Sequence, residues 1–361
     1  MSNYRRELNH FYRQGNISNK SIEQALILTK VRPDSNQWKQ FIGNLMLYLG
    51  VLAIASAVML FIASNWDGLG RFAKFGLLQA LIIVSIYGYW LSVSKNDLLA
   101  KQLGDVSREN QTLSVAGQTA LLVASLLLGV MLGFFGQTYQ TGADTWQLFF
   151  TWAILIIPWV LIAKFPALWI IWIALLNLSA VLYFQVFGSL FSAIFFSAEE
   201  LIWLILLINT TALVIWELLQ NRYKWLAQSW AIRTLALVSG TSLTILVTWY
   251  IVNIASAAFP FAPVLWLAGM ALVYVIYRRR QIDLFMLAMA SLSGLTVITC
   301  ATGELIFNIL NADTGGFFMM AVLVILLATL SASWLKAVHK ESLGISSNVE
   351  ALTISGANDD E

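Results

Sequence analysis

The sequence predicts an all-α, polytopic integral membrane protein with about ten transmembrane helices. Hydrophobic residues make up 59% of the 361 residues and charged residues only 11%, with a mean hydropathy of +0.75. Soluble domains are about half apolar and about a quarter charged. The apolar residues gather in runs near the ~20 residues that cross a bilayer core. The 15 tryptophans suit a chain with many helix ends at membrane–water interfaces.

Residues 1–40 precede the first apolar run and are predicted to form a cytoplasmic amphipathic helical arm. The apolar residues of its first part share one helical face: Tyr4, Leu8, Phe11 and Tyr12. A capping-box pattern at 21–24 predicts a second helix. We expect this pair to cover the cytoplasmic loops or to dock on the membrane surface or a partner. The arm does not resemble a cleavable signal peptide, and its cations form no stripe, so nucleic acid is not an expected partner.

Ten apolar segments follow, and each is predicted to span the bilayer. They are 41–64, 72–94, 112–136, 146–163, 167–187, 200–220, 233–254, 261–277, 283–303 and 316–337. We assign 41–165 to an N-terminal membrane domain of four spans and 166–338 to a C-terminal membrane region of six. Residues 339–361 form a polar cytoplasmic tail, which we expect to be disordered.

The residues between these segments refine the prediction. The turn at 164–166 connects the fourth and fifth spans, and Pro158 predicts a kink in the fourth. The apolar run 188–197 is too short to span, so we expect it to be re-entrant or to lie in the interface.

The distribution of positive charge predicts the orientation. With ten spans, nineteen of the 21 Lys and Arg residues fall on the side that also holds both termini. Only Arg71 and Lys74 fall on the opposite side. This bias predicts that both termini are cytoplasmic. An eleventh span at 188–197 would largely remove the bias.

Polar residues inside the spans have two interpretations. Asn177 and Asn209 are examples, and they either line a hydrophilic pathway or hydrogen-bond between helices. No span carries an ionisable residue near its centre, which weighs against a proton antiporter. Gly129-x-x-x-Gly133 on the third span predicts close helix packing.

Two polar stretches, which follow the first and third spans, are predicted to meet at a periplasmic rim. Their candidate residues are Asn65, Trp66, Asp67, Arg71, Lys74, Gln137, Tyr139, Gln140, Asp144 and Trp146. They form either an outward-facing binding recess or a set of loop caps and interfacial anchors. In the recess, Asp67 and Arg71 share one helical face. In the capping interpretation, Asn65 closes the first helix and Asp67 caps the second.

The few metal-binding residue types predict neither a metal site nor a cofactor. Cys300 is the single cysteine, and the two histidines, His10 and His339, lie far apart in the sequence. A thiolate site or a His-based centre needs several such residues close together. We therefore predict no catalytic residue.

The motifs of the first part of the chain resemble a bacterial membrane-protein family, domain of unknown function 2157 (DUF2157). The resemblance covers roughly residues 1–165. It rests on 15–18 (Gly-Asn-Ile-Ser), 63–67 (Ala-Ser-Asn-Trp-Asp) and 136–140 (Gly-Gln-Thr-Tyr-Gln), with Asp144 and Trp152. It implies a bacterial inner-membrane protein without an established activity, and it supplies no catalytic residues.

Three functions remain open from the sequence. The first is a non-enzymatic scaffold or partner-binding subunit that sits in the lipid bilayer and contacts another membrane protein. The alternative is a transporter of a neutral or lipidic solute, because ten spans also describe drug/metabolite transporters, although the two halves show no internal similarity. The third is a membrane enzyme acting on envelope precursors, with Asp67 or Asp144 as general base.

Overall fold

The structure is a computed structural model that describes residues 35–65, 68, 70–102, 114–191, 198–220, 222–226, 228–253, 260–280, 283–309 and 314–357. All regular elements in these ranges are helical, which confirms the all-α prediction. The predicted arm is outside the described residues up to position 34. The structural statements below refer to the described ranges.

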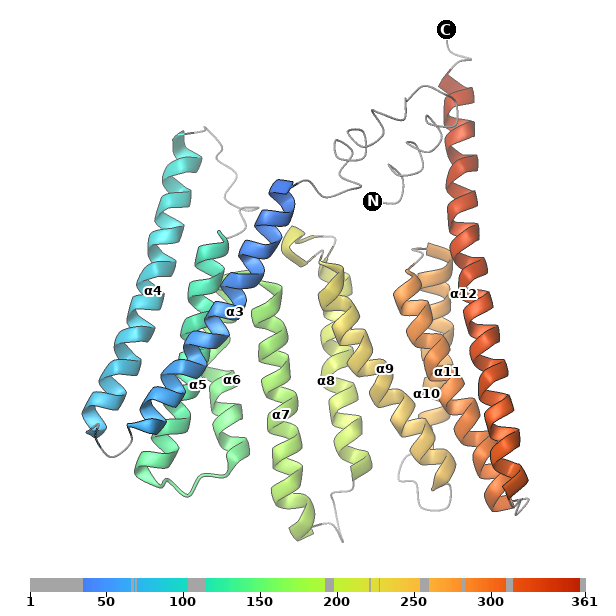
Figure 1. The fold of residues 1–361 in the computed structure, drawn as a ribbon, viewed down its shortest axis with the longest axis horizontal. Coiled ribbons are helices and arrows are strands. Elements are labelled where there is room, and N and C mark those ends of the chain that lie inside the picture. Colours follow the sequence, from blue (N-terminus) through green and yellow to red (C-terminus); the bar gives the residue numbers. More distant parts are fainter. Residues whose placement is uncertain are drawn as a thin grey trace. The chain divides into compact units, whose positions relative to one another are not determined.

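The described helices follow the predicted order of apolar segments (Figure 1). They are α3 (Ser35–Ser64), α4 (Arg71–Gln102), α5 (Val115–Tyr139), α6 (Thr145–Ala163), α7 (Pro166–Phe191), α8 (Ala198–Leu219), α9 (Ser229–Val252), α10 (Ala262–Tyr274), α11 (Leu284–Glu304) and α12 (Thr314–Ala357). Two π-helical segments, Val275–Arg280 and Leu305–Ile309, extend α10 and α11. Lys224–Leu226 forms a short 3₁₀ helix.

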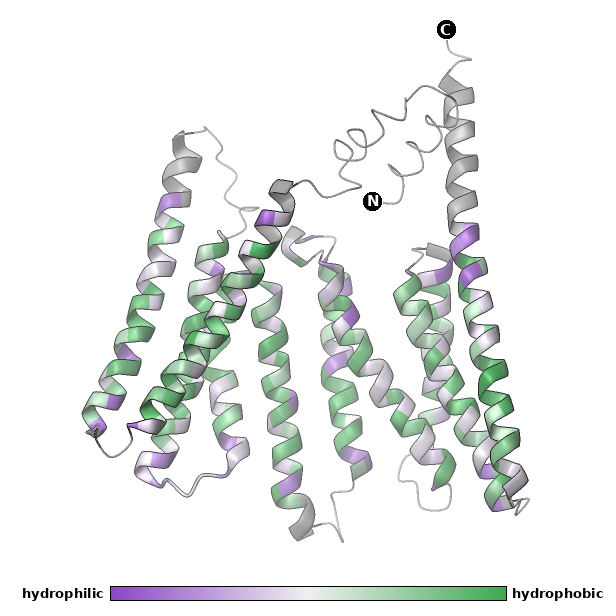
Figure 2. Ribbon diagram, viewed as in Figure 1, coloured by the Kyte–Doolittle hydropathy of each residue, from purple (hydrophilic) through white to green (hydrophobic). Residues whose placement is uncertain are grey.

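Nine helices in the described ranges are long and apolar enough to cross a membrane. They correspond to nine of the ten predicted spans, and the chain is a multi-pass membrane protein. The predicted eighth span corresponds to Ala262–Arg278, a shorter apolar helix. Figure 2 shows the hydrophobic residues along the helices and many of the hydrophilic ones towards the helix ends.

Several helix boundaries differ from the prediction. Helix α3 begins at Ser35, and α7 continues to Phe191, so the first part of the predicted separate segment 188–197 belongs to α7. Helix α12 continues to Ala357, where we expected a disordered tail. Extending an existing helix needs no new nucleus, and no proline interrupts α12. Polar composition alone therefore misplaced the end of this helix.

The chain divides into two compact units, Met46–Pro263 and a second unit of Met1–Leu45 with Val264–Glu361. Within Met46–Pro263, consecutive helices from α4 to α9 run antiparallel (Figure 1). The α3–α4 and α5–α6 connections lie at the same end of this unit. Its core takes side chains from successive helices, among them Ile62, Leu78, Leu121, Leu127, Ile156 and Leu168.

Two indoles tie α5, α6 and α7 together. The Nε1 of Trp152 on α6 donates to the backbone oxygen of Ser125 on α5 at 2.8 Å. The Nε1 of Trp172 on α7 donates to the backbone oxygen of Ala153 at 3.0 Å. The Trp152 ring lies directly over Gly129, so the close-packing prediction is confirmed at this glycine. These contacts hold the middle of the three helices at fixed spacing.

Two asparagines join α7 and α8. The Nδ2 of Asn209 donates to the Oδ1 of Asn177 at 2.8 Å, and the reverse bond is 3.3 Å. Each Nδ2 also donates to a backbone oxygen of its own helix: Asn209 to Ile205, and Asn177 to Ile173. Of the two interpretations of these residues, the structure therefore agrees with interhelical hydrogen bonding.

Candidate functional site

The loop between α5 and α6 has a tightly turned backbone. Gln140 follows α5 with φ 44° and ψ 50°, and Gly142 has φ 66°. A non-glycine residue adopts this left-handed conformation only at a cost in conformational energy. The conformation is nevertheless common just after the last residue of a helix. Asp144 then precedes α6 in an extended conformation, and its carboxylate makes no capping hydrogen bond to that helix. The turn thus brings two helix ends together and leaves the Asp144 carboxylate available.

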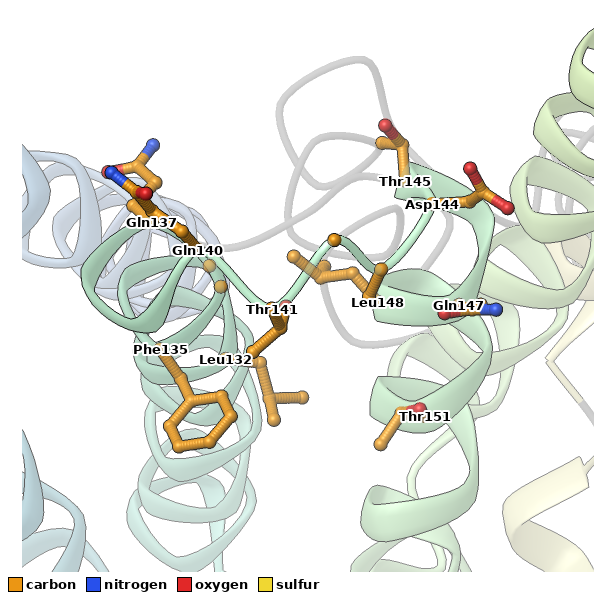
Figure 3. Close-up of a pocket in the computed structure, with 14 residues that line it drawn as sticks. Leu132, Phe135, Gln137, Gln140, Thr141, Asp144, Thr145, Gln147, Leu148 and Thr151 are labelled. Carbon is orange, nitrogen blue, oxygen red and sulfur yellow. The ribbon is translucent and has the colours of Figure 1, made fainter.

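A cleft of about 540 Å³ lies between the end of α5 and the start of α6 (Figure 3). Its polar side chains are amides, hydroxyls and one carboxylate, and Leu132 and Leu148 point towards each other across the gap. The lining consists of Leu132, Gly133, Phe135, Gly136, Gln137, Gln140, Thr141, Gly142, Ala143, Asp144, Thr145, Gln147, Leu148 and Thr151. We call this feature the α5–α6 cleft. Asp144 is the one ionisable residue of the lining.

Two glycines form an open part of the wall. A Cβ placed on Gly133 or Gly136 would have no heavy atom within 4 Å among its described neighbours. The predicted close packing is therefore wrong at Gly133, whereas it holds one turn earlier at Gly129. The absent side chains leave space that a bound group can occupy.

Three of the predicted rim residues line the cleft. Gln137 and Gln140 lie on the α5 side, and Asp144 lies where α6 begins (Figure 3). Amides both donate and accept hydrogen bonds, whereas an ionised carboxylate only accepts. This set of groups suits reversible binding of a polar group.

The two aromatic rim residues that the structure describes, Tyr139 and Trp146, contact neighbouring helices and are not part of the cleft lining. Tyr139 stacks on Phe75 of α4, with ring centroids 5.9 Å apart. Trp146 packs edge-on against Tyr183 of α7 at 5.1 Å. Its Nε1 is buried and has no hydrogen-bond partner among the described residues. These contacts brace the two ends of the loop from opposite sides.

Of the described residues around the α3–α4 connection, Asn65, Arg71 and Lys74 are not part of the α5–α6 cleft lining. The Asn65 side chain closes α3, donating to the Phe61 backbone oxygen at 2.9 Å, as the capping interpretation predicts. Trp66 and Asp67 lie outside the described residues. Arg71 is exposed at the start of α4, and Lys74 is 5% exposed one turn later. Lys74, also a candidate residue of the rim, is therefore a buried residue of α4, and its place in the rim stays a prediction.

Sequence reasoning missed several lining residues, two of which helical spacing identifies. Thr141, Thr145, Gln147 and Thr151 belong to the cleft but were not predicted. Asp144, Gln147, Leu148 and Thr151 recur at intervals of three, one and three residues, which places them on one face of a helix. Extending this face from Asp144 along α6 would have found Gln147 and Thr151.

Comparison with known proteins gives one family. Residues 9–169 match the family described as predicted membrane protein (DUF2157). The predicted resemblance is thereby confirmed over nearly the range expected, and the match includes the whole α5–α6 cleft. Neither a curated protein nor a solved structure matches the chain.

Proposed function

We propose that the chain is a non-enzymatic binding subunit of a bacterial cell inner membrane. It engages another membrane protein through the α5–α6 cleft, and both its termini are cytoplasmic. One observation carries the proposal, namely the convergence of uncharged polar side chains and the single Asp144 carboxylate on a cleft of about 540 Å³. Such a lining accepts a neutral or cationic, hydrogen-bonding segment of a partner.

The charge distribution supports a periplasmic position for the cleft. Nineteen of the 21 Lys and Arg residues fall on the opposite side of the predicted topology. Helix α4 begins with Arg71, and its first residues lie at the same end of the unit as the α5–α6 connection. The docking segment of the partner would therefore be periplasmic.

The helix interior supports binding over the transporter alternative. Asn177 and Asn209 bond to each other and to their own helices. These amides have an interhelical role, and a solute pathway is not needed to explain them. The enzyme alternative depends on Asp67 or Asp144 as a base, and the described cleft lining supplies neither a His nor a Cys beside Asp144.

Site-specific photocrosslinking in intact cells tests the proposal. A photoreactive amino acid replaces Gln147, which is exposed and lines the cleft. The matched control replaces Phe72, which is 93% exposed in the first turn of α4 and is not part of the lining. We expect a discrete protein adduct from position 147 and none of that mass from position 72.

A blocking variant makes the experiment decisive. Gly136→Leu places a side chain in the open part of the wall, where the described neighbours leave free space. We expect this variant to accumulate normally and to lose the adduct from position 147. An adduct of equal yield in the blocked variant, or the same adduct from position 72, would refute partner binding in the cleft.

A further inference from the structure

The glycine face of α5 continues from its contact with α6 into the α5–α6 cleft. Gly129, Gly133 and Gly136 recur at intervals of four and three residues, so they lie on one face of the helix. Gly129 is covered, because a Cβ there would lie 2.4 Å from the Trp152 ring. Gly133 and Gly136 line the cleft, and a Cβ on either would meet no described atom within 4 Å. The same face is thus filled by an indole at one level and open from the next turn outwards.

The register of the two antiparallel helices explains the open part of this face (Figure 1). Leu148 and Thr145 precede Trp152 by four and seven residues, so they continue its face of α6 towards the levels of Gly133 and Gly136. Both side chains are shorter than an indole, and neither reaches within 4 Å of a Cβ built on these glycines. The described chain therefore supplies no ring at these two levels.

The chemistry of the gap suits a ring with a polar edge. Leu132 and Leu148 point towards each other across it, and Thr141 and Thr151 add hydroxyls to the lining (Figure 3). An acyl chain can bond to neither hydroxyl, whereas the N–H of an indole or the O–H of a phenol can donate to both. Trp152 already shows this combination, because its ring lies over a glycine while its Nε1 donates to a backbone oxygen of α5 at 2.8 Å.

We propose that the partner inserts a tryptophan or tyrosine side chain over Gly133 and Gly136. This inference rests on the proposed function and names the anchoring residue of the docking segment. The inserted ring extends the existing α5–α6 interface, because it repeats the contact of Trp152 with Gly129 further out along the same face. Buried aromatic anchors in fitted pockets carry much of the binding energy at protein interfaces, and they lose little conformational entropy on binding.

Binding of 5-fluoroindole to the purified full chain in lipid nanodiscs tests the site without the partner. Fluorine NMR follows the titration, and empty nanodiscs measure partition of the probe into lipid. The matched probe is 5-fluoro-1-methylindole, because its methyl group replaces the N–H donor. Gly136→Leu fills the open wall, and Gly76→Leu is its control, since Gly76 is exposed on α4 and also has free space. The second test variant, Leu148→Trp, places a ring of the chain itself opposite Gly133.

We expect saturable binding of 5-fluoroindole that the Gly76→Leu control retains. Gly136→Leu and Leu148→Trp should each weaken it about tenfold or more, because both occupy the space of the ring. The methylated probe should bind about fivefold more weakly than 5-fluoroindole, because it cannot donate the hydrogen bond. A signal no larger than that of empty nanodiscs, or equal binding to Gly136→Leu and to the wild type, would overturn the aromatic site.

Photocrosslinking from position 147 separates this inference from the proposed function. In isolated membranes, indole should lower the yield of the adduct, and 1-methylindole at the same concentration should lower it less. If the adduct forms but does not respond to indole, the partner binds without a ring over the glycines, so the aromatic anchor is overturned while the proposed function stands. If 5-fluoroindole binds as expected but no adduct forms, the proposed function fails and a protein partner is overturned as the occupant of the site.

Discussion

Replacing Gly129 with alanine tests how tightly α5 and α6 are joined. The new Cβ would lie 2.4 Å from Cε2 and Cζ2 of Trp152. Ordinary contacts begin near 3.4 Å, so the indole has to move by about 1 Å. That movement strains the bond from Nε1 to the Ser125 oxygen, which is 2.8 Å long.

The expected cost follows from these contacts. Overpacking of a close-packed site costs roughly 1–3 kcal/mol, and losing the indole hydrogen bond costs about 1 kcal/mol. Alanine regains up to about 1 kcal/mol of helix propensity. We therefore expect Gly129→Ala to lower the free energy of unfolding by about 2 kcal/mol.

Reversible unfolding in mixed detergent micelles, followed by tryptophan fluorescence, measures this change. Gly136→Ala is the matched control, because it makes the same substitution on α5 at a position with free space. It should be neutral or slightly stabilising. Trp152→Phe separates the two contributions, since it removes the hydrogen bond and shrinks the ring. If Gly129→Ala were as stable as Gly136→Ala, the close indole contact would be refuted.

Three further predictions use other parts of the chain. Asn177→Leu should destabilise the protein by about 1 kcal/mol, because it leaves the Asn209 amide without its partner across the interface. Adding Asn209→Leu should recover part of this loss in the same unfolding assay. If the losses of the two single variants were additive in the double variant, the pairing would be contradicted. Gly136→Leu should retain wild-type unfolding, and a large drop would show that the cleft wall is not open. Phosphatase and fluorescent-protein fusions should report cytoplasm, periplasm and cytoplasm in turn at Asn16, Gly142 and Ala357; a periplasmic C-terminus would reject the predicted span number.

Much of the fold was predictable from sequence because membrane insertion requires long apolar runs. The nine described spans appear at the predicted places for this reason. Asn65 was also predictable, since a polar residue at a helix end satisfies local backbone groups. The extent of α12 was not predictable, because helix continuation past the membrane depends on propagation more than on composition.

The candidate site was only partly predictable. Gln137, Gln140 and Asp144 lie close in sequence to one turn, so their convergence needs no long-range contact. The burial of Lys74 depends on how α4 packs, and its sequence neighbours do not reveal that packing. Gly129 and Gly133 look alike in the sequence, yet one lies under Trp152 and the other faces open space. The covering residue, Trp152, lies 23 positions after Gly129 and 19 after Gly133, so the sequence around the glycines does not reveal which of them it covers.

The bond from Trp152 to Ser125 has a mechanical consequence for the α5–α6 cleft. Trp152 is adjacent to Thr151 of the lining, so the two helices are pinned immediately beyond the inner end of the cleft. The loop at 140–144 joins them at the outer end. A partner that enters should therefore tilt α6 about this pivot and widen the mouth, while the middle of the bundle keeps its spacing. Spin-label distances that grew equally at both levels would rule out such a pivot.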